Sequence, residues 1–438
     1  MKILRVLLAA LVCVALAVTV AACGDDNKDN GSGGSPSTTK TDGGNAAGGP
    51  SQATVDLALK YTGGKAGAAD SAKPPVKIGF TTMIGGTPEF PEQVAALDAV
   101  TKFINEKLGG VGGAPLEIVK CTIQSEEDGQ KCGAEFLDAG VPVINQALIV
   151  VGNASLYKTV VPKVPVLVGT PSTGPDATTA GVYNFTGGGP GVIYAMSKDL
   201  ANLGAKNVAL ISVGNPGGKF TMEQIAVPAL DALGVKHSKI VYYTDTATTP
   251  DIVSSLQNAG GSKADAIFFD PSTPQQCASL AAAMKQLGIK GIPVEVTPIC
   301  NAQSVIDAAG GDAGLEGWRQ WGFGENPRVA GVPEVDAYND IMKSYGQADF
   351  AATGFASSTV RDFLTLAKFI NEGGAAPTAD SIRKSILAFR GPTWMVPGEV
   401  NCEKPPTKET PSVCGNVGVG AAVEGGKWKS LGSIVVGS

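Results

Sequence analysis

Short apolar runs rich in β-branched residues alternate, from residue 76 onward, with longer segments whose apolar residues recur at helical spacing. This alternation predicts parallel strands joined by crossover helices. The predicted strands are residues 76–80, 116–119, 147–151 and 164–168, then 208–212, 240–243, 266–269 and 294–296. The predicted helices are residues 93–108, 134–137, 192–203, 221–233, 251–259, 275–287 and 363–373. The runs 147–151 and 164–168 are continuously apolar, which is typical of strands buried on both faces.

The pattern restarts after Phe185, through the glycine-rich segment 187–191. About 360 residues follow the start of the pattern, which is too many for one ordinary core and suits two domains. We therefore predict an α/β fold with two doubly wound, parallel-sheet lobes and a cleft between them. Ligands of open α/β sheets bind at the carboxyl ends of the strands, so we expect a ligand site in that cleft.

The first 24 residues have the pattern of an export signal. Lys2 and Arg5 provide a positive start, residues 7–20 are almost wholly apolar, and Ala21 and Ala22 precede Cys23. The apolar run is about 14 residues, shorter than the roughly 20 that a membrane-spanning helix needs. Residues 20–23 resemble the bacterial lipoprotein box, in which the cysteine is acylated after processing. The alternative is an ordinary secretory signal with an incidental cysteine.

The segment after Cys23 is dominated by Gly, Ser, Thr, Asn, Asp and Lys, so it buries too little apolar surface to fold. We interpret residues 23–75 as a lipid-anchored, disordered tether. Val55, Leu57, Leu59 and Tyr61 interrupt the polar run. This short stretch either docks on the folded body or is an apolar piece of linker, and we favour docking.

Charge and composition exclude several classes of function. The formal net charge is -6 and the pI is near 5.1, which argues against a nucleic-acid partner. The chain has a single histidine, His237, which disfavours a histidine-ligated metal site or a His-dependent triad. We expect no cofactor, no metal and no enzymatic activity.

Six cysteines remain once Cys13 leaves with the signal and Cys23 takes a lipid, an even number that suits an oxidising compartment. Six cysteines allow 15 pairings on paper. Proximity in the sequence favours three short loops, and a zinc site is the alternative, although no CxxC spacing occurs. The favoured pairs are Cys121 with Cys132, Cys277 with Cys300, and Cys402 with Cys414.

Several motifs, in this order and spacing, carry a family resemblance. They are strand 76–80 with a glycine-containing loop and a long helix ending at 103–113, the run 149–152 before a helix start, and the run 164–173. Together they resemble solute-binding proteins of the leucine/isoleucine/valine-binding type, the type I periplasmic binding fold. The resemblance covers residue 76 to the C-terminus, and residues 363–373 look like the family's late helix.

The family fold crosses between its lobes three times, and the breaks in the pattern place these crossings near residues 183–187, 316–321 and 415–420. The domain organisation that follows is a signal peptide (1–22), the tether (23–75), lobe 1 (76–185 and 321–416) and lobe 2 (186–320 and 417–438).

In this family, main-chain amides and hydroxyls at helix starts hold the anionic end of the ligand, as helix dipoles favour. The matching positions here are Ser155, beside Asn153, and Ser172 with Thr173; their alternative role is helix capping. In the second lobe the candidates are Asn215, Ser272 and Asn301. The tyrosine and acid that hold an ammonium in amino-acid-binding members are missing there. A plain α-amino acid is therefore doubtful, although Asp270 or Glu89 could supply the charge.

Aromatic residues near the loops and crossings are candidates for gripping an apolar ligand, with core packing as the alternative. They are Phe90, Phe185, Trp321 and Phe323. The glycine-rich segments lack the Lys-Ser/Thr of a Walker-type phosphate site.

The resemblance implies a lipid-anchored substrate-binding protein of an ABC importer, which closes on a small polar or amphipathic solute. Its expected partners are the solute, an ABC permease in the cytoplasmic membrane, and the membrane itself through the lipid on Cys23. We expect a monomer outside the cytoplasm, at the outer face of the cell membrane or in the periplasm. The alternatives are a ligand-sensing clamp for a signalling partner, and a secreted hydrolase that would need His237 beside a serine and an acid.

Overall fold

A computed structural model describes residues 48–86, 88–373, 376–406 and 408–436 of the 438. All of them belong to one compact unit. The predicted export signal, Cys23 and the tether as far as residue 47 lie outside the described residues.

The first sheet has five parallel strands in the order β2-β1-β3-β4-β5. Consecutive strands of the chain lie on both sides of β1, so the strand order reverses between β1 and β3. The strands are β1 (Val76–Thr82), β2 (Leu116–Thr122), β3 (Ile144–Gln146), β4 (Val166–Val168) and β5 (Val182–Tyr183).

The second sheet has seven strands in the order β12-β11-β10-β9-β8-β6-β7. Strands β6 to β10 are parallel, and the C-terminal hairpin β11–β12 adds antiparallel strands beside β10. The order reverses between β6 and β8. The strands are β6 (Val208–Val213), β7 (Val241–Tyr243), β8 (Ala266–Asp270), β9 (Val294–Val296), β10 (Trp318–Gly322), β11 (Val417–Glu424) and β12 (Lys427–Val435).

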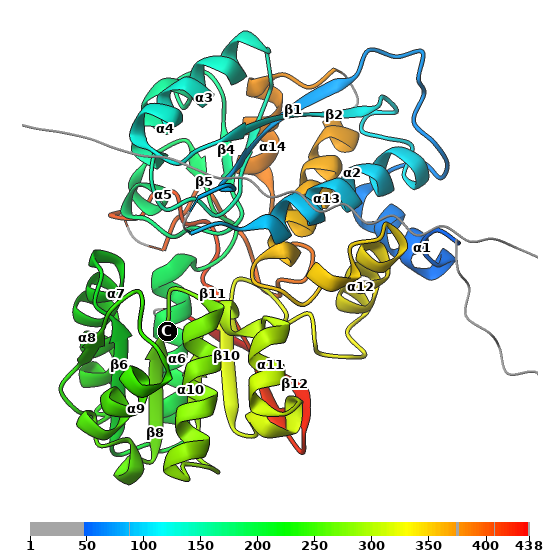
Figure 1. The fold of residues 1–438 in the computed structure, drawn as a ribbon. Coiled ribbons are helices and arrows are strands. Elements are labelled where there is room, and N and C mark those ends of the chain that lie inside the picture. Colours follow the sequence, from blue (N-terminus) through cyan, green and yellow to red (C-terminus); the bar gives the residue numbers. More distant parts are fainter. Residues whose placement is uncertain (1–47, 87, 374–375, 407, 437–438) are drawn as a thin grey trace, which may run out of the picture. The chain divides into compact units, whose positions relative to one another are not determined.

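Helices cover both faces of the five-stranded sheet (Figure 1). On one face α2 and α13 bury Phe103 and Phe363 against Phe80, and on the other α3 and α4 bury Phe136 and Leu156. The helices of this lobe are α2 (Pro91–Lys107), α3 (Glu126–Asp138), α4 (Asn153–Val160), α5 (Gly174–Thr178), α12 (Pro333–Ser344), η5 (Ala348–Phe350), α13 (Ala356–Gly373) and α14 (Ala379–Ala388).

The seven-stranded sheet is also covered on both faces. Helices α9 and α10 pack against Ile211 and Phe269, whereas α6, η1 and α8 pack against Leu210 and Phe268. The helices of this lobe are α6 (Gly188–Asn202), α7 (Pro216–Phe220), the π-helical η1 (Thr221–Ala226), α8 (Val227–Ala232), α9 (Thr249–Asn258), η2 (Gly261–Lys263), α10 (Pro274–Leu287), η3 (Pro298–Asn301), α11 (Gln303–Ala309) and η4 (Asp312–Leu315). The two-lobed, doubly wound α/β architecture is as predicted.

Two predicted elements differ from the structure. The strand predicted at 147–151 is instead β3 at 144–146; Leu148 and Ile149, which follow it, are buried in two different side-chain clusters and not paired in the sheet. The helix predicted at 221–233 changes at residue 227 from a π-helical to an α-helical turn. Pro228 has no N–H to donate at this point, which interrupts the regular helical ladder.

The segment predicted to dock does so, and the tether therefore ends earlier than residue 75. Residues Gln52–Thr62 form helix α1, whose face with Val55, Ala58 and Thr62 is buried against α12 and α13. Thr54 Oγ1 donates to Asp340 at 2.6 Å. The following arm runs along α2, where Ala69 N donates to the carbonyl of Asn105 at 2.7 Å.

The chain passes between the sheets after β5, after β10 and before β11. The first and third passages hydrogen-bond to each other, since Asn184 N donates to Ser412 O and Cys414 N donates to Asn184 O, each at 2.8 Å. The second passage follows Gly322, so Trp321 belongs to the seven-stranded sheet and not to lobe 1 as predicted.

All three predicted disulfides are confirmed. The Cα–Cα distances are 5.6 Å for Cys121–Cys132, 5.4 Å for Cys277–Cys300 and 4.3 Å for Cys402–Cys414. The third bridge ends at Cys414, whose amide bonds the carbonyl of Asn184, and so it ties the start of the third passage to residue 402.

Candidate functional site

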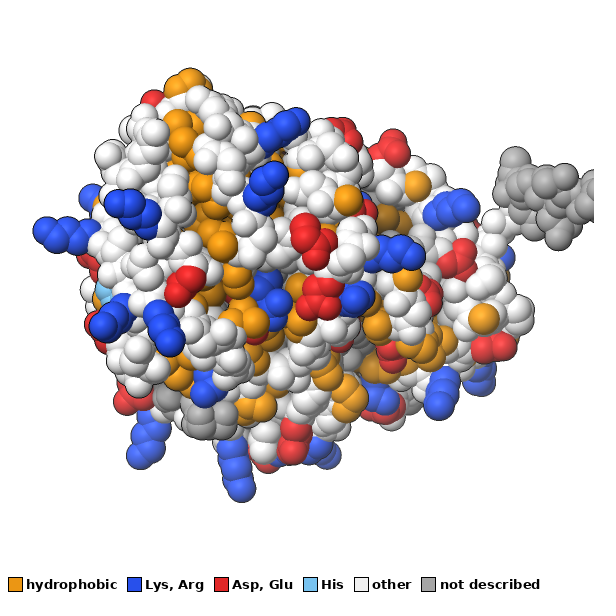
Figure 2. Space-filling model, turned by 90° about the horizontal axis from the view of Figure 1, so that it is seen from below, with side chains coloured by type: hydrophobic (Ala, Val, Ile, Leu, Met, Phe, Trp, Pro, Cys, Tyr) orange, Lys and Arg blue, Asp and Glu red, His pale blue; other side chains and the backbone are white. Residues whose placement is uncertain are grey.

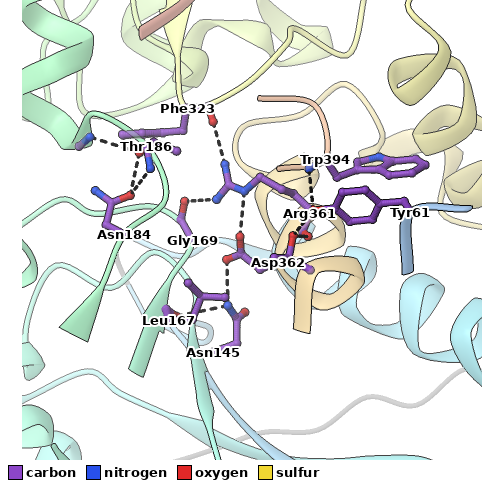
Figure 3. A network of polar contacts seen from close by, with 12 residues as sticks. Tyr61, Asn145, Leu167, Gly169, Asn184, Thr186, Phe323, Arg361, Asp362 and Trp394 are labelled. Carbon is purple, nitrogen blue, oxygen red and sulfur yellow. Dashed lines mark hydrogen bonds and ion pairs between the residues drawn. The ribbon is translucent and has the colours of Figure 1, made fainter. Parts of the chain in front are cut away.

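The carboxyl ends of the two sheets face each other across Arg361 of α13. Its Nη1 donates to the carbonyl of Phe323, directly after β10, at 2.7 Å, and its Nη2 donates to the carbonyl of Gly169, directly after β4, at 2.6 Å (Figure 3). Strand β10 is parallel to β6, β8 and β9, and β4 is parallel to β1 and β3. The edges at which such sheets bind ligands therefore meet here.

Arg361 is held by a buried partner. Its Nε donates to Asp362 Oδ1 at 2.8 Å, and Asp362 Oδ2 accepts from Asn145 Nδ2 at 2.9 Å. Burial raises the pKa of Asp362, and the neighbouring guanidinium and Asn145 oppose this rise. The sequence analysis missed this pair, although two adjacent charges inside the apolar stretch of α13 were a signal for it.

In the five-stranded sheet, polar side chains lie at the ends of the two strands between which the strand order reverses. Thr81 of β1 and Gln146 of β3 are register partners, and both are fully buried. Thr81 Oγ1 and Gln146 Oε1 make no hydrogen bond with any described residue. Buried polar groups are normally paired, so this edge has spare hydrogen-bonding capacity.

The equivalent point of the seven-stranded sheet carries a carboxyl group. Ser212 of β6 and Asp270 of β8 are register partners, and Ser212 Oγ donates to Asp270 Oδ2 at 3.0 Å. Asp270 is 8% exposed. Burial raises its pKa to about 7, and the hydrogen bond from Ser212 works against that rise.

In the five-stranded lobe, three of the residues predicted to contact the ligand donate hydrogen bonds to Asp176 and do not point into a free binding space. The amides of Ser172 and Thr173 each donate to Asp176 Oδ2 at 2.8 Å, and Asn153 Nδ2 donates to Oδ1 at 2.8 Å. Asp176 is fully buried. The amides at the start of α5 that we expected to hold a ligand's anionic end are therefore engaged by a carboxylate of the protein itself.

Ser155, the fourth candidate in this lobe, is engaged in a similar way. Its hydroxyl donates to Glu126, and Gly152 N donates to Glu126 Oε1 at 3.0 Å. These hydrogen bonds lower the pKa of Glu126. The start of α4 thus already faces a carboxylate.

The structure brings together two of the three candidates in the seven-stranded lobe. Asn215 Nδ2 and Ser272 Oγ donate to Asp245 Oδ1 at 2.8 and 3.2 Å. Asn301 lies apart from them, buried, with its side-chain amide paired to that of Asn326.

The aromatic candidates divide into two groups. Phe90 and Phe323 both pack against Phe355. The ring centroid of Phe355 is 6.4 Å from that of Phe90 and 6.1 Å from that of Phe323, so the three rings link the two lobes. Phe185 and Trp321 are almost fully buried in the cores, which corresponds to the alternative of core packing.

Three large apolar side chains are exposed in the segments that follow strands of the two facing edges. Ile84 lies two residues after β1, Val150 lies four residues after β3, and Phe220 is the last residue of α7, seven residues after β6; their exposures are 37%, 44% and 53%. They account for three of the five such side chains among the described residues. Exposed apolar surface therefore occurs in segments that follow strands of both edges.

His237 does not belong to this site. It pairs with Val208, at the amino end of β6, and its ring contacts Ser238 O and Asp231. The hydrolase hypothesis required a serine and an acid around His237 at a cleft, so the structure contradicts it.

Two surface cavities also lie elsewhere. The larger, of about 460 Å³, is lined by residues at the amino end of the five-stranded sheet, including Lys73, Val76 and Pro142. The smaller, of about 370 Å³, lies between α4 and α5 beside Tyr157. Neither lies where strands of both sheets end, and we favour the facing edges because both switch points carry polar groups there.

The sequence profile of the periplasmic binding proteins matches residues 75–402. The chain belongs to this family. It is a family of solute-binding proteins and not of enzymes, as we expected. No curated protein matches the chain.

Solved structures with the same fold include binding proteins for different solutes. A Rhodopseudomonas palustris solute-binding protein in complex with 4-hydroxybenzoate is 16% identical, with a TM-score of 0.64 over 83% of this chain and 98% of that one. A Thermotoga maritima leucine-binding protein is 17% identical, with a TM-score of 0.63 over 82% and 99%. A Thermus thermophilus branched-chain amino acid transporter protein with bound valine is 15% identical, with a TM-score of 0.66 over 83% and 97%.

The remaining surface adds two observations. On the face in Figure 2, Lys and Arg side chains are interspersed with Asp and Glu side chains and form no continuous basic stripe among the described residues. None of the described helices is long and apolar enough to cross a membrane.

Proposed function

We propose that this protein is the extracytoplasmic substrate-binding lipoprotein of an ABC importer. It binds a small polar or amphipathic solute between its lobes and delivers it to a membrane permease. The observation that carries the binding role is the meeting of two strand-end edges, each with a polar register pair at the reversal of strand order. Membership in the periplasmic binding proteins supports the extracytoplasmic location.

The proposed mechanism is a shift of population between open and closed arrangements. A solute that contacts both edges gains its full set of contacts only when they approach, so binding favours the closed form. The three passages between the sheets are the places where the backbone can turn. Arg361 stays bonded to Gly169 and Phe323 beside the second passage, which makes it the pivot of this motion.

The lipid anchor is supported by the sequence alone, whereas the permease is supported by the family and by the ABC transporter proteins that share the fold. Residues 20–23 resemble a lipoprotein box, and Cys23 would carry the lipid. Helix α1 is bound to the lobe from Ser51 onward, so at most roughly 100 Å of extended chain separates Cys23 from the folded body. That distance keeps the binding protein close to the membrane in which its permease lies.

A screen of solutes tests this function. The full chain, purified in mild detergent, is heated in the presence of amino acids, amines, aromatic acids, sugars and nucleosides. A solute that binds the folded state raises the melting temperature by linkage. At least one class should do so reproducibly, and native mass spectrometry should detect it as a one-to-one complex. No shift with any class would contradict the proposal.

The lipid is tested separately by intact-mass measurement of the protein from cell membranes. We expect a diacylated Cys23 at the N-terminus, and Cys23→Ser should release the protein from the membrane fraction. A membrane-bound Cys23→Ser variant would contradict the anchor without affecting the binding role.

A further inference from the structure

The carboxyl group of Asp270 lacks the partner that a buried acid normally has. Its Oδ2 accepts from Ser212, and no donor among the described residues contacts Oδ1. The ion pairs of the described residues include none with Asp270. An unpaired buried carboxylate is costly, so it either takes up a proton or binds a cation.

The groups around Asp270 provide no positive charge to balance it. Tyr243 of β7 donates its hydroxyl to the Asp270 carbonyl at 3.1 Å, and Tyr242 donates to Glu223 of η1. Asp245 lies beside Asn215 and Ser272 and adds a negative charge. Lys219 of α7 lies over the ring of Tyr242, 5.9 Å from its centroid, and is not paired with Asp270.

The opposite edge leaves little to bind an anion. The amides at the start of α5 are bonded to Asp176, and Ser155 and Gly152 N are bonded to Glu126. The guanidinium of Arg361 is bonded to Asp362 and two carbonyls. A ligand carboxylate would therefore have to displace an internal one.

What this edge does offer is neutral hydrogen-bonding capacity, which includes the unpaired hydroxyls of Thr81 and Thr173. Gln146 Oε1 and Asn153 Oδ1 are buried and unpaired among the described residues, and both belong to amides whose nitrogens already bond Asp176. Ile84, Val150 and Phe220 add exposed apolar surface. The two edges thus combine neutral hydrogen-bonding groups, an acid without a cationic partner, and exposed apolar side chains in the segments that follow their strands.

We propose that Asp270 binds a cationic nitrogen of the solute, and that the solute is an organic amine with an apolar body and no carboxylate. This inference rests on the proposed function, since it names the class of solute that the same site takes. Asp270 is the last residue of β8, at the point where the strand order reverses and where open α/β sheets bind their ligands. The ammonium of the solute neutralises the carboxylate of Asp270, for which the described residues provide no cation.

Proton linkage follows from this geometry. Burial raises the pKa of Asp270 to about 7, so the free protein holds a proton there at lower pH, whereas an ammonium requires the ionised form. Affinity for an amine should therefore fall about tenfold from pH 8 to pH 6. A neutral or anionic ligand that used protonated Asp270 would show the opposite trend.

The test compares ligands of one shape and different charge. Tyramine, 4-hydroxyphenethyl alcohol and 4-hydroxyphenylacetate share a ring, and hexylamine, hexanol and hexanoate form an aliphatic series. Calorimetric titration of the full chain at pH 6 and pH 8 measures the affinity for each. We expect the amine of at least one series to bind at least tenfold tighter than its alcohol and acid at pH 8, and to weaken about tenfold at pH 6.

Two variants locate the effect. Asp270→Asn keeps the shape and the acceptor for Ser212, and should lose amine binding at least tenfold together with its pH dependence. Glu92→Gln is the matched control, because Glu92 is a second buried acid whose pKa is raised to about 7, and it lies in the other lobe. This variant should bind the amine as the unchanged protein does, and the melting temperature of each free variant reports its folding.

The results separate the two proposals. Tighter binding of an alcohol or acid than of its amine, or unchanged amine binding by Asp270→Asn, would overturn the amine inference and leave the solute-binding function standing. A failure of both amines to bind would also overturn the inference. Only the absence of binding across the broader screen would overturn the solute-binding function.

Discussion

Asp176 determines the local structure at the starts of both α4 and α5. It accepts hydrogen bonds from the side chains of Gln146, Asn153 and Tyr157, and from the amides of Ser172 and Thr173. Five donors offset the cost of burying the charge. The burial of Tyr157 and the adjacent carboxylate raise the pKa of that tyrosine well above its ordinary value.

Asp176→Asn should therefore be destabilising although it keeps the shape. An amide has one acceptor oxygen in place of two, and its NH₂ would face the donors at the start of α5. Hydrogen bonds to a charged group contribute about 1.5–3 kcal/mol, and we expect a loss of that order in the free energy of unfolding. Denaturant unfolding measures it, with Asp349→Asn, at an exposed acid, as the control that should change little. Equal stability of the two variants would contradict this account.

Glu92 makes stability depend on pH. It lies in the first turn of α2, is buried, and accepts from Phe355 N at 3.4 Å. Burial raises its pKa from 4.5 to about 7. The folded state therefore keeps a proton that the unfolded state releases between these values, and the free energy of unfolding falls as the pH rises through this window.

Glu92→Gln should remove this part of the pH dependence. The conversion of the pKa shift gives about 3 kcal/mol at most, so the variant should gain stability relative to the unchanged protein on going from pH 4.5 to pH 8. Urea unfolding at several pH values measures the difference. Asp270, whose pKa is also raised to about 7, contributes a similar pH dependence of the free energy of unfolding. It is unchanged in the variant and serves as an internal comparison. A parallel pH profile for the two proteins would contradict the expectation.

At the residue scale the sequence indicated where polar groups gather, but not how they pair. The family resemblance pointed to Asn153, Ser172 and Thr173 as ligand contacts, which stays a prediction, and the structure brings all three onto one carboxylate. Their common partner Asp176 is a helix-start acid that sequence reasoning treats as ordinary. Arg361 was missed because its acceptors Gly169 and Phe323 are far away in the chain.

At the scale of elements, the spacing of apolar residues predicted an element correctly wherever that element buries a continuous face. Strands β1, β4, β6, β8 and β9 overlap their predicted ranges. The prediction failed at 147–151, where Leu148 and Ile149 are buried by side-chain packing and not by strand pairing. Local pattern cannot distinguish these two reasons for burial.

Helix α1 shows how a few anchors fix an otherwise weakly apolar element. The Tyr61 hydroxyl is bonded to Thr365 at 2.9 Å and accepts from Trp394 N at 3.1 Å, and its ring lies edge-on to Trp394 at 5.3 Å. Burial raises the pKa of Tyr61 to about 12, so it stays protonated and able to donate.

Tyr61→Phe should destabilise the protein through the lost hydroxyl alone. It leaves the ring contact and removes two hydrogen bonds, one of which leaves the Trp394 amide without this acceptor, for an expected loss of about 1–3 kcal/mol. Tyr194→Phe is the matched control, since no described residue hydrogen-bonds to the Tyr194 hydroxyl. Chemical denaturation measures both, and hydrogen exchange in α1 should rise only in Tyr61→Phe. Equal exchange in the two variants would show that the hydroxyl does not hold the helix.

At the scale of the whole molecule, Arg361 joins the ends of both sheets. Its three acceptors, on Asp362, Gly169 and Phe323, surround a planar guanidinium. A lysine carries the same charge but cannot present donors in this fork. The contact therefore depends on shape as well as charge.

Arg361→Lys should destabilise the protein, and Arg361→Ala more so, because the alanine leaves Asp362 buried without its cation. Removing one partner of a buried pair costs about 3–5 kcal/mol. Lys429→Ala is the control, since both side chains of its pair with Glu424 are exposed and such a pair contributes little. Calorimetric melting measures all three, and a loss for Arg361→Ala no larger than for Lys429→Ala would contradict the role of Arg361.

The crystal structure of the complex with the solute found by screening tests the central claim most directly. We predict density for one small molecule between the sheets, in contact with residues that follow β1 or β3 on one side and β6 or β8 on the other. A solute bound instead in the cavity beside Lys73 and Pro142, or touching only one lobe, would contradict the account.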